Sequence, residues 1–267
     1  MVGHADYDYH GVSAIVTGST HGIGRGIAKG LADAGANVVV NARTAADVTE
    51  TAAELDGDAD GRVVGVTADV GDPAGIETLV ESAIDAFGTV SMLVNNAAVW
   101  PMEESMIGAS LDDWDTAMDV NVRAQFHASK LVARHMIEEE IEGCIVNHSS
   151  QTGDRRTGAR GVYGVSKTSV NGLTWRMATE LAGHGIRVNA VSTDVTESHQ
   201  LRYEAGLEAE RRGKDRRTVL EEWGAKRPLG RLGRPSDIAD AVLFLGSDRA
   251  SYVVGTILRV SGGGNLQ

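Results

Sequence analysis

The chain has 267 residues, 42% of them hydrophobic, with a formal net charge of −12 and a pI near 5.1. This length suits a single α/β domain, residues 1–267, and the acidic balance argues against nucleic acid or an anionic membrane as the main partner. No apolar run is long enough for a membrane span, no signal peptide is apparent, and the single Cys144 excludes an intrachain disulfide. We therefore expect a cytoplasmic protein.

The first predicted unit is a strand over 12–17, a helix ending at Ala34 and a second strand over 37–41. Its first turn reads Gly18-Ser-Thr-His-Gly22-Ile-Gly24, so the spacing is G-x-x-x-G-x-G and not the usual G-x-G-x-x-G. Glycines in such a turn let backbone N–H groups and a helix N-terminus approach a pyrophosphate closely. The turn predicts a nucleotide site, with a purely structural turn as the alternative.

Strands and helices continue to alternate along the rest of the chain. Strands are expected over 62–67, 92–94, 144–147, 186–191 and 257–260, and helices over 44–55, 73–87, 111–140, 162–182 and 235–245. Seven strands interleaved with helices predict an α/β fold with a doubly wound parallel sheet and helices on both faces. The Val- and Ile-rich strands, which do not alternate with polar residues, fit burial on both faces.

The segment 196–227, about thirty residues long and rich in charged side chains, interrupts this alternation. It follows the carboxyl end of a predicted strand, which is where ligands bind in α/β sheets. It is therefore interpreted as a lid over a substrate pocket, the alternative being a solvated helical excursion.

Tyr163 and Lys167 would lie one turn apart on the same face of a helix. The ammonium could stabilise a phenolate and lower a tyrosine pKa that is normally about 10. Ser150, at the end of the preceding strand, could hold a substrate oxygen against the tyrosine. A surface pair is the alternative for these two residues alone. The histidines lack metal-ligand spacing, and we expect no metal site.

Taken together, several motifs resemble the classical short-chain dehydrogenase/reductase family over nearly the whole chain. The matching motifs are Thr17-Gly18-x-x-x-Gly22-x-Gly24, Asp69-Val70, Asn95-Asn96-Ala97, Asn121, Ser150 and Tyr163-x-x-x-Lys167. The run from Pro228 to Pro235 and the glycines at 262–264 are similar to the 3-oxoacyl carrier-protein reductase and sugar dehydrogenase branches.

This resemblance implies a Rossmann fold, a homotetramer, and hydride transfer between a nicotinamide cofactor and a carbonyl or alcohol. Tyr163 would be the general acid/base, and Lys167 would lower its pKa and bind the ribose. Ser150 would orient the substrate oxygen, and Asn121 would hold a water that relays protons. The implied cofactor-binding residues are Gly18, Thr20, His21, Gly22, Ile23, Gly24, Arg43, Asp69, Val70, Asn96, Ala97, Tyr163, Lys167, Val195 and Thr196.

The end of the second strand bears on the choice of cofactor. Enzymes that use NAD usually place an acid there to bind the ribose hydroxyls. This chain instead has Asn41-Ala42-Arg43, and a guanidinium would attract a 2′-phosphate. We predict a preference for NADP, with NAD possible; the alternative is that Arg43 points to solvent.

One departure from the family pattern concerns the substrate side. After the sixth strand, where the family has Pro-Gly, the chain has Thr193-Asp194. Asp194 could favour the oxidised nicotinamide ring or bind hydroxyls of a polyol; the alternative is that it points into water. The predicted substrate contacts are Ser150, Gln151, Tyr163 and Asp194, with Trp100, Met102, Asp154 and Arg156 as further candidates.

The favoured function is oxidoreduction of a small polar substrate, a sugar or polyol. The first alternative is a 3-oxoacyl reductase acting on a carrier-protein or coenzyme A thioester, whose phosphopantetheine could meet the basic cluster at 211–217. The second is a catalytically silent cofactor-sensing protein on the same fold, because fold does not fix function. The intact set of Asn121, Ser150, Tyr163 and Lys167 argues against the second alternative.

Overall fold

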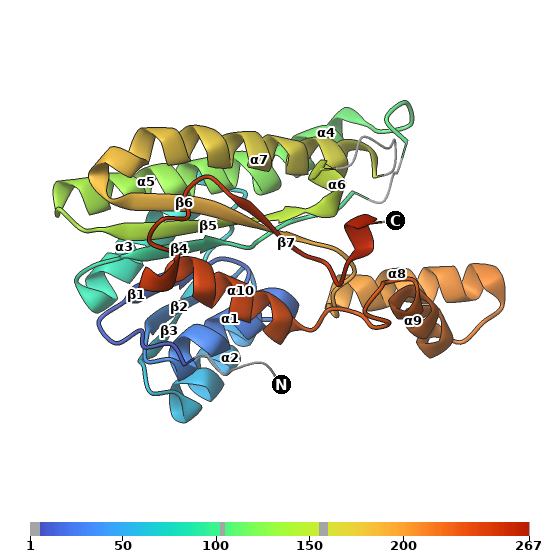
Figure 1. Ribbon diagram of the computed structural model, residues 1–267, viewed down its shortest axis with the longest axis horizontal. Helices are drawn as coiled ribbons and strands as arrows, with labels where there is room; N and C mark the ends of the chain where they lie inside the picture. The colour runs from blue at the N-terminus through green and yellow to red at the C-terminus, as the bar shows by residue number, and fades with distance from the viewer. Residues whose placement is uncertain (1–5, 102–104, 155–159, 267) are drawn as a thin grey trace.

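The computed structural model describes residues 6–101, 105–154 and 160–266. Seven parallel strands form one sheet in the order β3-β2-β1-β4-β5-β6-β7 (Figure 1). This confirms the predicted doubly wound α/β fold. The strands are β1 Ser13–Val16, β2 Asn37–Ala42, β3 Val63–Thr67, β4 Met92–Asn95, β5 Gly143–Ser150, β6 Ile186–Thr193 and β7 Ile257–Val260.

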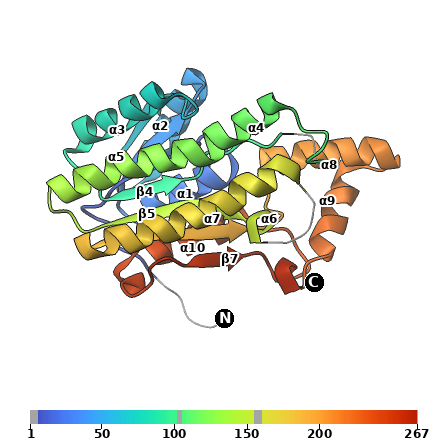
Figure 2. The same cartoon turned by 90° about the horizontal axis from the view of Figure 1, so that it is seen from above.

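Helices cover both faces of the sheet (Figures 1 and 2). One layer contains α1 Gly22–Asp33, α2 Ala45–Asp58 and α10 Pro235–Gly246, and the other contains α3 Pro73–Phe87, α5 Ala124–Glu138 and α7 Gly161–Leu181. Strand β2 shows why its sequence does not alternate: Val38 and Val40 pack into the first layer and Val39 into the second. Burial on both faces requires apolar residues at consecutive positions.

The strand order places a crevice at the carboxyl ends of β1 and β4. Strand β1 pairs with β2 on one side and with β4 on the other, so the connections that follow β1 and β4 leave toward opposite faces of the sheet. Such a switch point is where open α/β sheets bind ligands. The glycine-rich turn follows β1, and Asn96-Ala97 follows β4.

The predicted single helix over 111–140 is wrong. Helix α4 Leu111–Met118 is separated from α5 by a π-helical turn, Asp119–Arg123, in which the amide of Ala124 donates to the carbonyl of Asp119. Hydrophobic periodicity does not reveal one extra residue in a single turn. Turns of this kind occur frequently at functional sites, and this one contains Asn121.

The charged excursion forms two helices, α8 His199–Arg212 and α9 Arg216–Ala225, which project beyond the end of the sheet (Figure 1). Ala205, Ala209 and Val219 form a small apolar cluster between them. The remaining short elements are α6 Gln151–Asp154 and 3-10 turns at Ala182–His184, Asp248–Ala250 and Gly264–Leu266. Within the described residues, no helix is both long and apolar enough to cross a membrane.

Candidate functional site

A cavity of about 680 Å³ opens at the carboxyl end of the sheet, between the glycine-rich turn and helix α8. Most residues predicted to bind a cofactor line it. They are Gly18, His21, Gly22, Ile23, Gly24, Arg43, Asp69, Val70, Asn96, Ala97, Tyr163, Lys167, Val195 and Thr196. Thr20 is not among the lining residues, and its hydroxyl instead hydrogen-bonds Nδ1 of His21 at 2.8 Å.

The glycine-rich turn is packed too closely for side chains. A Cβ atom on Gly24 would lie 2.3 Å from the carbonyl oxygen of Gly18 and 2.4 Å from Nδ2 of Asn96. That same Nδ2 donates to the carbonyls of Thr17 and Gly18, which fixes the turn against the end of β4. His21 gives α1 no side-chain cap, so its first-turn amides remain available to an anion. This cradle fits the pyrophosphate of a dinucleotide.

Three of the four predicted catalytic residues meet at the other end of the cavity. Ser150 is the last residue of β5, and Tyr163 and Lys167 lie one turn apart on α7. The Lys167 ammonium lies 5.7 Å from the centre of the Tyr163 ring and donates to the carbonyl of His148 at 2.7 Å. Ser150 hydrogen-bonds the Tyr163 phenol. The lysine is only 1% exposed, so its charge is strongly desolvated.

Burial dominates the acidities of this pair. It raises the pKa of Tyr163 above its ordinary 10, while the hydrogen bond from Ser150 and the charge of Arg160 lower it and the Glu204 carboxylate raises it. Burial lowers the pKa of Lys167 to about 7. The sequence predicted that Lys167 would lower the pKa of Tyr163. Without a bound cofactor the net pKa of Tyr163 is raised, because burial is the largest of these causes. The lowering expected from Lys167 together with an oxidised nicotinamide stays a prediction.

Asn121 lies behind this centre and does not line the cavity. Its side chain is fully buried, accepts from the amide of Val99 at 2.8 Å, and donates to the Val99 carbonyl and to Oγ of Ser166. These bonds join the π-helical turn to the segment after β4 and to α7. The water relay predicted for Asn121 stays a prediction.

His148 has a larger structural role than the sequence suggested. It is buried between Asn96 and Thr193, with a ring nitrogen 3.0 Å from an oxygen of each. Burial and the nearby Lys167 charge lower its pKa to about 3, so the ring is neutral. His148 therefore ties the ends of β4, β5 and β6 together and offers its carbonyl to Lys167. Its place two residues before Ser150 was the only signal in the sequence.

A stack of three side chains forms the substrate side of the cavity. The Trp100 ring stacks on Tyr163, with centroids 5.6 Å apart and 27° between the planes. The guanidinium of Arg160 covers Trp100 at 3.6 Å from the ring centroid. Glu204, on helix α8, lies 3.6 Å from Arg160. Trp100 was a predicted substrate candidate, whereas Arg160 and Glu204 were missed because no local motif marks them.

Comparison with known proteins agrees with this geometry. A family model described as enoyl-(acyl carrier protein) reductase matches residues 18–265. The chain is 34% identical to glucose 1-dehydrogenase 2 of Bacillus subtilis over 97% of its length and 96% of that protein. It is also 34% identical to 3-oxoacyl-[acyl-carrier-protein] reductase FabG of Thermotoga maritima over 73% of its length and 74% of that protein. The chain belongs to the short-chain dehydrogenase/reductase family.

Among solved structures, the L-sorbose reductase of Gluconobacter frateurii, complexed with NADPH and L-sorbose, superposes with a TM-score of 0.91. It shares 29% identity with this short-chain dehydrogenase/reductase and covers 97% of this chain and 98% of its own. The superposition therefore covers nearly the whole chain.

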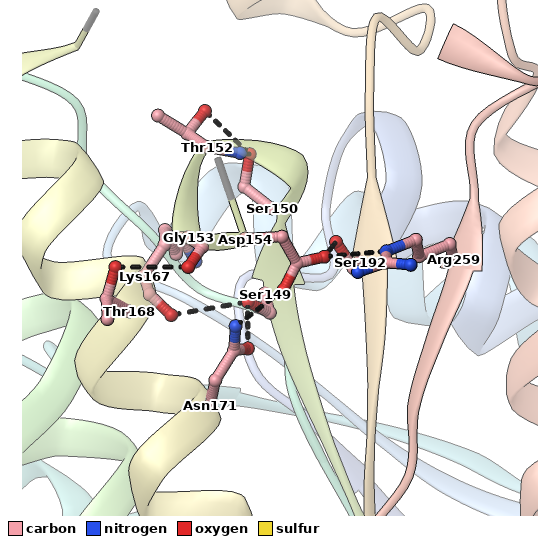
Figure 3. Close-up of polar contacts among 10 residues, drawn as sticks. All are labelled: Ser149, Ser150, Thr152, Gly153, Asp154, Lys167, Thr168, Asn171, Ser192 and Arg259. Carbon is pink, nitrogen blue, oxygen red and sulfur yellow. Dashed lines mark hydrogen bonds and ion pairs between the residues drawn. The ribbon is translucent and has the colours of Figure 1, made fainter. Parts of the chain in front are cut away.

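Asp154 of this short-chain dehydrogenase/reductase, a predicted substrate candidate, does not line the cavity and is instead hydrogen-bonded within the protein. Its carboxylate accepts hydrogen bonds from Nδ2 of Asn171 at 2.9 Å, Oγ of Ser192 at 3.2 Å and Nε of Arg259 at 3.1 Å (Figure 3). Asn171 in turn accepts from Ser149, the neighbour of Ser150. The network fixes α6, and hence Ser150, against helix α7.

The other residues predicted to contact substrate lie in different surroundings. Gln151 is buried, and Thr152 lines the cavity in its place. Met102 and Arg156 lie outside the described residues. Asp194 lines the cavity, but its Oδ2 lies 2.5 Å from Nε of Arg227. The alternative that Asp194 points into water is therefore wrong, because its carboxylate pairs with a residue 33 positions away in the sequence. Its predicted role toward the nicotinamide or a polyol stays a prediction.

Glu204→Gln should lower the apparent pKa of Tyr163 in the pH profile of kcat/KM. Three charged groups face the phenol, namely Lys167, Arg160 and Glu204, and only the carboxylate raises its pKa. Removing that charge makes the phenolate easier to form, so the tyrosine-dependent limb moves to lower pH. Glu210→Gln, at an exposed position on the same helix, is the matched control. Identical profiles for the two variants would contradict the expected coupling.

Proposed function

We propose that this short-chain dehydrogenase/reductase transfers a hydride between NADP and a secondary alcohol or carbonyl of a small polar substrate, a sugar or polyol. The observation that carries the proposal is one cavity with an anion-binding glycine turn at one end and Ser150, Tyr163 and Lys167 at the other. The proposal treats residues 1–267 as one Rossmann-type domain with 196–227 as a lid, and the family resemblance favours a homotetramer.

When bound, the nicotinamide supplies or accepts the hydride and carries a positive charge in its oxidised state. The Ser150 hydroxyl holds the substrate oxygen beside the phenol. In the oxidation direction the Tyr163 phenolate removes the proton from that oxygen, and in reduction the phenol returns it. Lys167 holds the ribose and stabilises the phenolate, and Asn121 supports the proton path behind it. Fourteen of the fifteen residues predicted to bind the cofactor line the cavity, which supports this assignment.

Without a bound cofactor, the protein does not lower the pKa of Tyr163 toward neutrality. Bringing a tyrosine pKa from about 10 to near 7 takes roughly 4 kcal/mol of differential stabilisation. Burial works against this by raising the pKa of Tyr163. The required stabilisation must then come from positive charge added to a desolvated cleft, in which electrostatic interactions are strong. An oxidised nicotinamide beside a protonated Lys167 meets that requirement.

Arg43→Ala should reduce the preference for NADP over NAD by about tenfold or more, since a charge-assisted hydrogen bond contributes roughly 1.5–3 kcal/mol. Arg43 follows β2, is exposed and lines the cavity, and it has no ion-pair partner among the described residues. The measurement is the ratio of kcat/KM values for the two cofactors. Arg25→Ala is the control, because Arg25 pairs with Glu54 outside the cavity. An unchanged ratio in Arg43→Ala would remove the argument for NADP.

The substrate class is supported by the sugar-converting relatives and by the charge of the lid. In the excursion, four of the five basic residues at 211–217 pair with acidic neighbours: Arg211 with Glu208, Arg212 and Lys214 with Glu222, and Arg217 with Glu221. A surface neutralised in this way offers little attraction to a phosphopantetheine. This weakens the 3-oxoacyl alternative, which similarity to the Thermotoga protein keeps open.

The deciding experiment is a spectrophotometric screen of sugars, polyols and 3-oxoacyl thioesters with NADP and NAD, in both directions. The proposal expects turnover of at least one sugar or polyol, with NADP preferred. Turnover of thioesters alone would replace the proposed substrate with the first alternative. Cofactor binding without turnover of any substrate would favour the silent cofactor-sensing alternative.

A further inference from the structure

The excursion, 196–227, is closed at its base by a contact between Asp194, two residues before it, and Arg227, its last residue. Asp194 follows β6 and Arg227 follows α9, and Asp194 Oδ2 lies 2.5 Å from Arg227 Nε. Their side chains are 14% and 17% exposed. The backbone on either side is tied as well, because the amide of Gly233 donates to Val195 and Gly233 accepts from Glu197. The two chain segments thus meet in a narrow neck.

The charges of Asp194 and Arg227 compensate each other. The contact is an ion pair without the angular geometry of a hydrogen bond, and neither atom has a hydrogen-bond partner among the described residues. Removing one member of a buried pair leaves the other charge uncompensated, which is strongly destabilising. A neutral substitution of either residue should therefore disturb the neck, while neutralising both should disturb it less.

A third segment leaves room for this pair. A Cβ atom on Gly264 would lie 2.2 Å from Asp194 Oδ2 and 3.2 Å from the side chain of Arg227. The φ angle of Gly264 lies outside the left-handed region, so its backbone conformation would accept alanine. The absence of a side chain at Gly264 is therefore explained by the Asp194 carboxylate, and the C-terminal turn packs directly against the neck.

We propose that Asp194 and Arg227, packed against Gly264, form a clasp that closes the neck of the excursion and holds the Val195–Thr196 backbone at the cavity wall. They act as positioning residues, since Val195 and Thr196 directly follow Asp194 in the chain and line the cavity. The effect of the clasp on cofactor binding rests on the proposed function, whereas the closure of the neck is independent of it.

The test is a double-mutant cycle with Asp194→Asn, Arg227→Gln and the combined variant, measured first by trypsin cleavage of the unliganded protein. Cleavage within the excursion at Arg211, Arg212 or Lys214 reports its opening, and Arg227 precedes Pro228, so its replacement removes no efficient tryptic site. Each single variant should be cleaved about tenfold faster, and the combined variant no faster than either, as expected for coupled residues. Additive effects, or rates equal to wild type, would overturn the clasp.

Gly264→Ala is an independent test, because this variant keeps both charged side chains and only pushes them apart with the added methyl group. It should reproduce the faster cleavage of Asp194→Asn, whereas Gly183→Ala, at a position with open space and no left-handed φ, should match wild type. A Gly264→Ala protein cleaved like Gly183→Ala would also overturn the clasp.

The second readout is the dissociation constant of NADPH, followed by fluorescence. In the three clasp variants it should rise about tenfold, with the same non-additivity in the cycle. Faster cleavage with unchanged NADPH affinity would overturn the positioning role. If wild type binds neither NADPH nor NADH, the proposed function fails and the positioning role with it, while the cleavage cycle still decides whether the neck is clasped.

Discussion

Tyr163→Phe is expected to lower kcat by about 10²- to 10⁴-fold, the range typical for losing a positioned general acid or base. In the proposed function the phenol exchanges the proton with the substrate oxygen, and phenylalanine cannot replace it. The ring stacked on Trp100 is retained, so the substrate wall keeps its shape. The affinity for NADPH should change little, because only the proton-transferring atom is lost. Steady-state kinetics and fluorescence titration measure these two quantities.

Tyr252→Phe is the matched control, since that phenol is fully exposed and outside the cavity. It should have wild-type kinetics. A Tyr163→Phe protein with more than a tenth of wild-type kcat would exclude Tyr163 as the acid/base. Weak NADPH binding by the same variant would instead point to a structural defect.

The positions of Ser150, Tyr163 and Lys167, the three residues proposed to be catalytic at the cavity, could be predicted because each is fixed by local structure. Helical geometry alone brings Lys167 to the same face as Tyr163, and the end of β5 presents Ser150 to the switch-point crevice. The glycine turn was predictable for a similar reason, because its contacts involve residues adjacent to two neighbouring strands. In these cases a short motif and the strand order determine the site.

The remaining parts of the site depend on contacts between distant residues, which periodicity does not encode. Glu204 reaches the cavity only because α8 folds back over the stack of Arg160 and Trp100. Asp194 was correctly singled out as unusual, but its partner Arg227 lies at the far end of the excursion. The sequence thus shows that Asp194 is unusual, whereas its pairing with Arg227 becomes visible only in the folded structure.

The pKa of Lys167 shows how the fold alters even a correctly identified residue. From the sequence, an i,i+4 lysine is a full positive charge next to the phenol. In the structure the ammonium is buried and donates a hydrogen bond to the His148 carbonyl. A pKa near 7 means that proton uptake by Lys167 becomes part of forming the active site. Cofactor and substrate binding should therefore depend on pH near neutrality.

Lys167→Met should abolish most turnover and also remove a pH dependence of stability. The folded-state pKa of Lys167 is about 7, below the value of about 10.4 expected for an unfolded lysine. Between these values the unfolded chain binds more protons than the folded one. The free energy of unfolding of the unliganded protein should then rise with pH across this window, by up to about 1.4 kcal/mol per pH unit from this one group. Methionine fills similar space without a charge, so its variant should lack this contribution.

Chemical denaturation of wild type and Lys167→Met at intervals between pH 7 and 10 measures the difference directly. Lys130→Met, at an exposed position on α5, is the control and should keep the wild-type slope. Subtracting the Lys167→Met curve cancels all other titrating groups that the two proteins share. If the difference is flat with pH, Lys167 titrates as an ordinary lysine. In that case the ammonium beside Tyr163 stays charged through neutral pH.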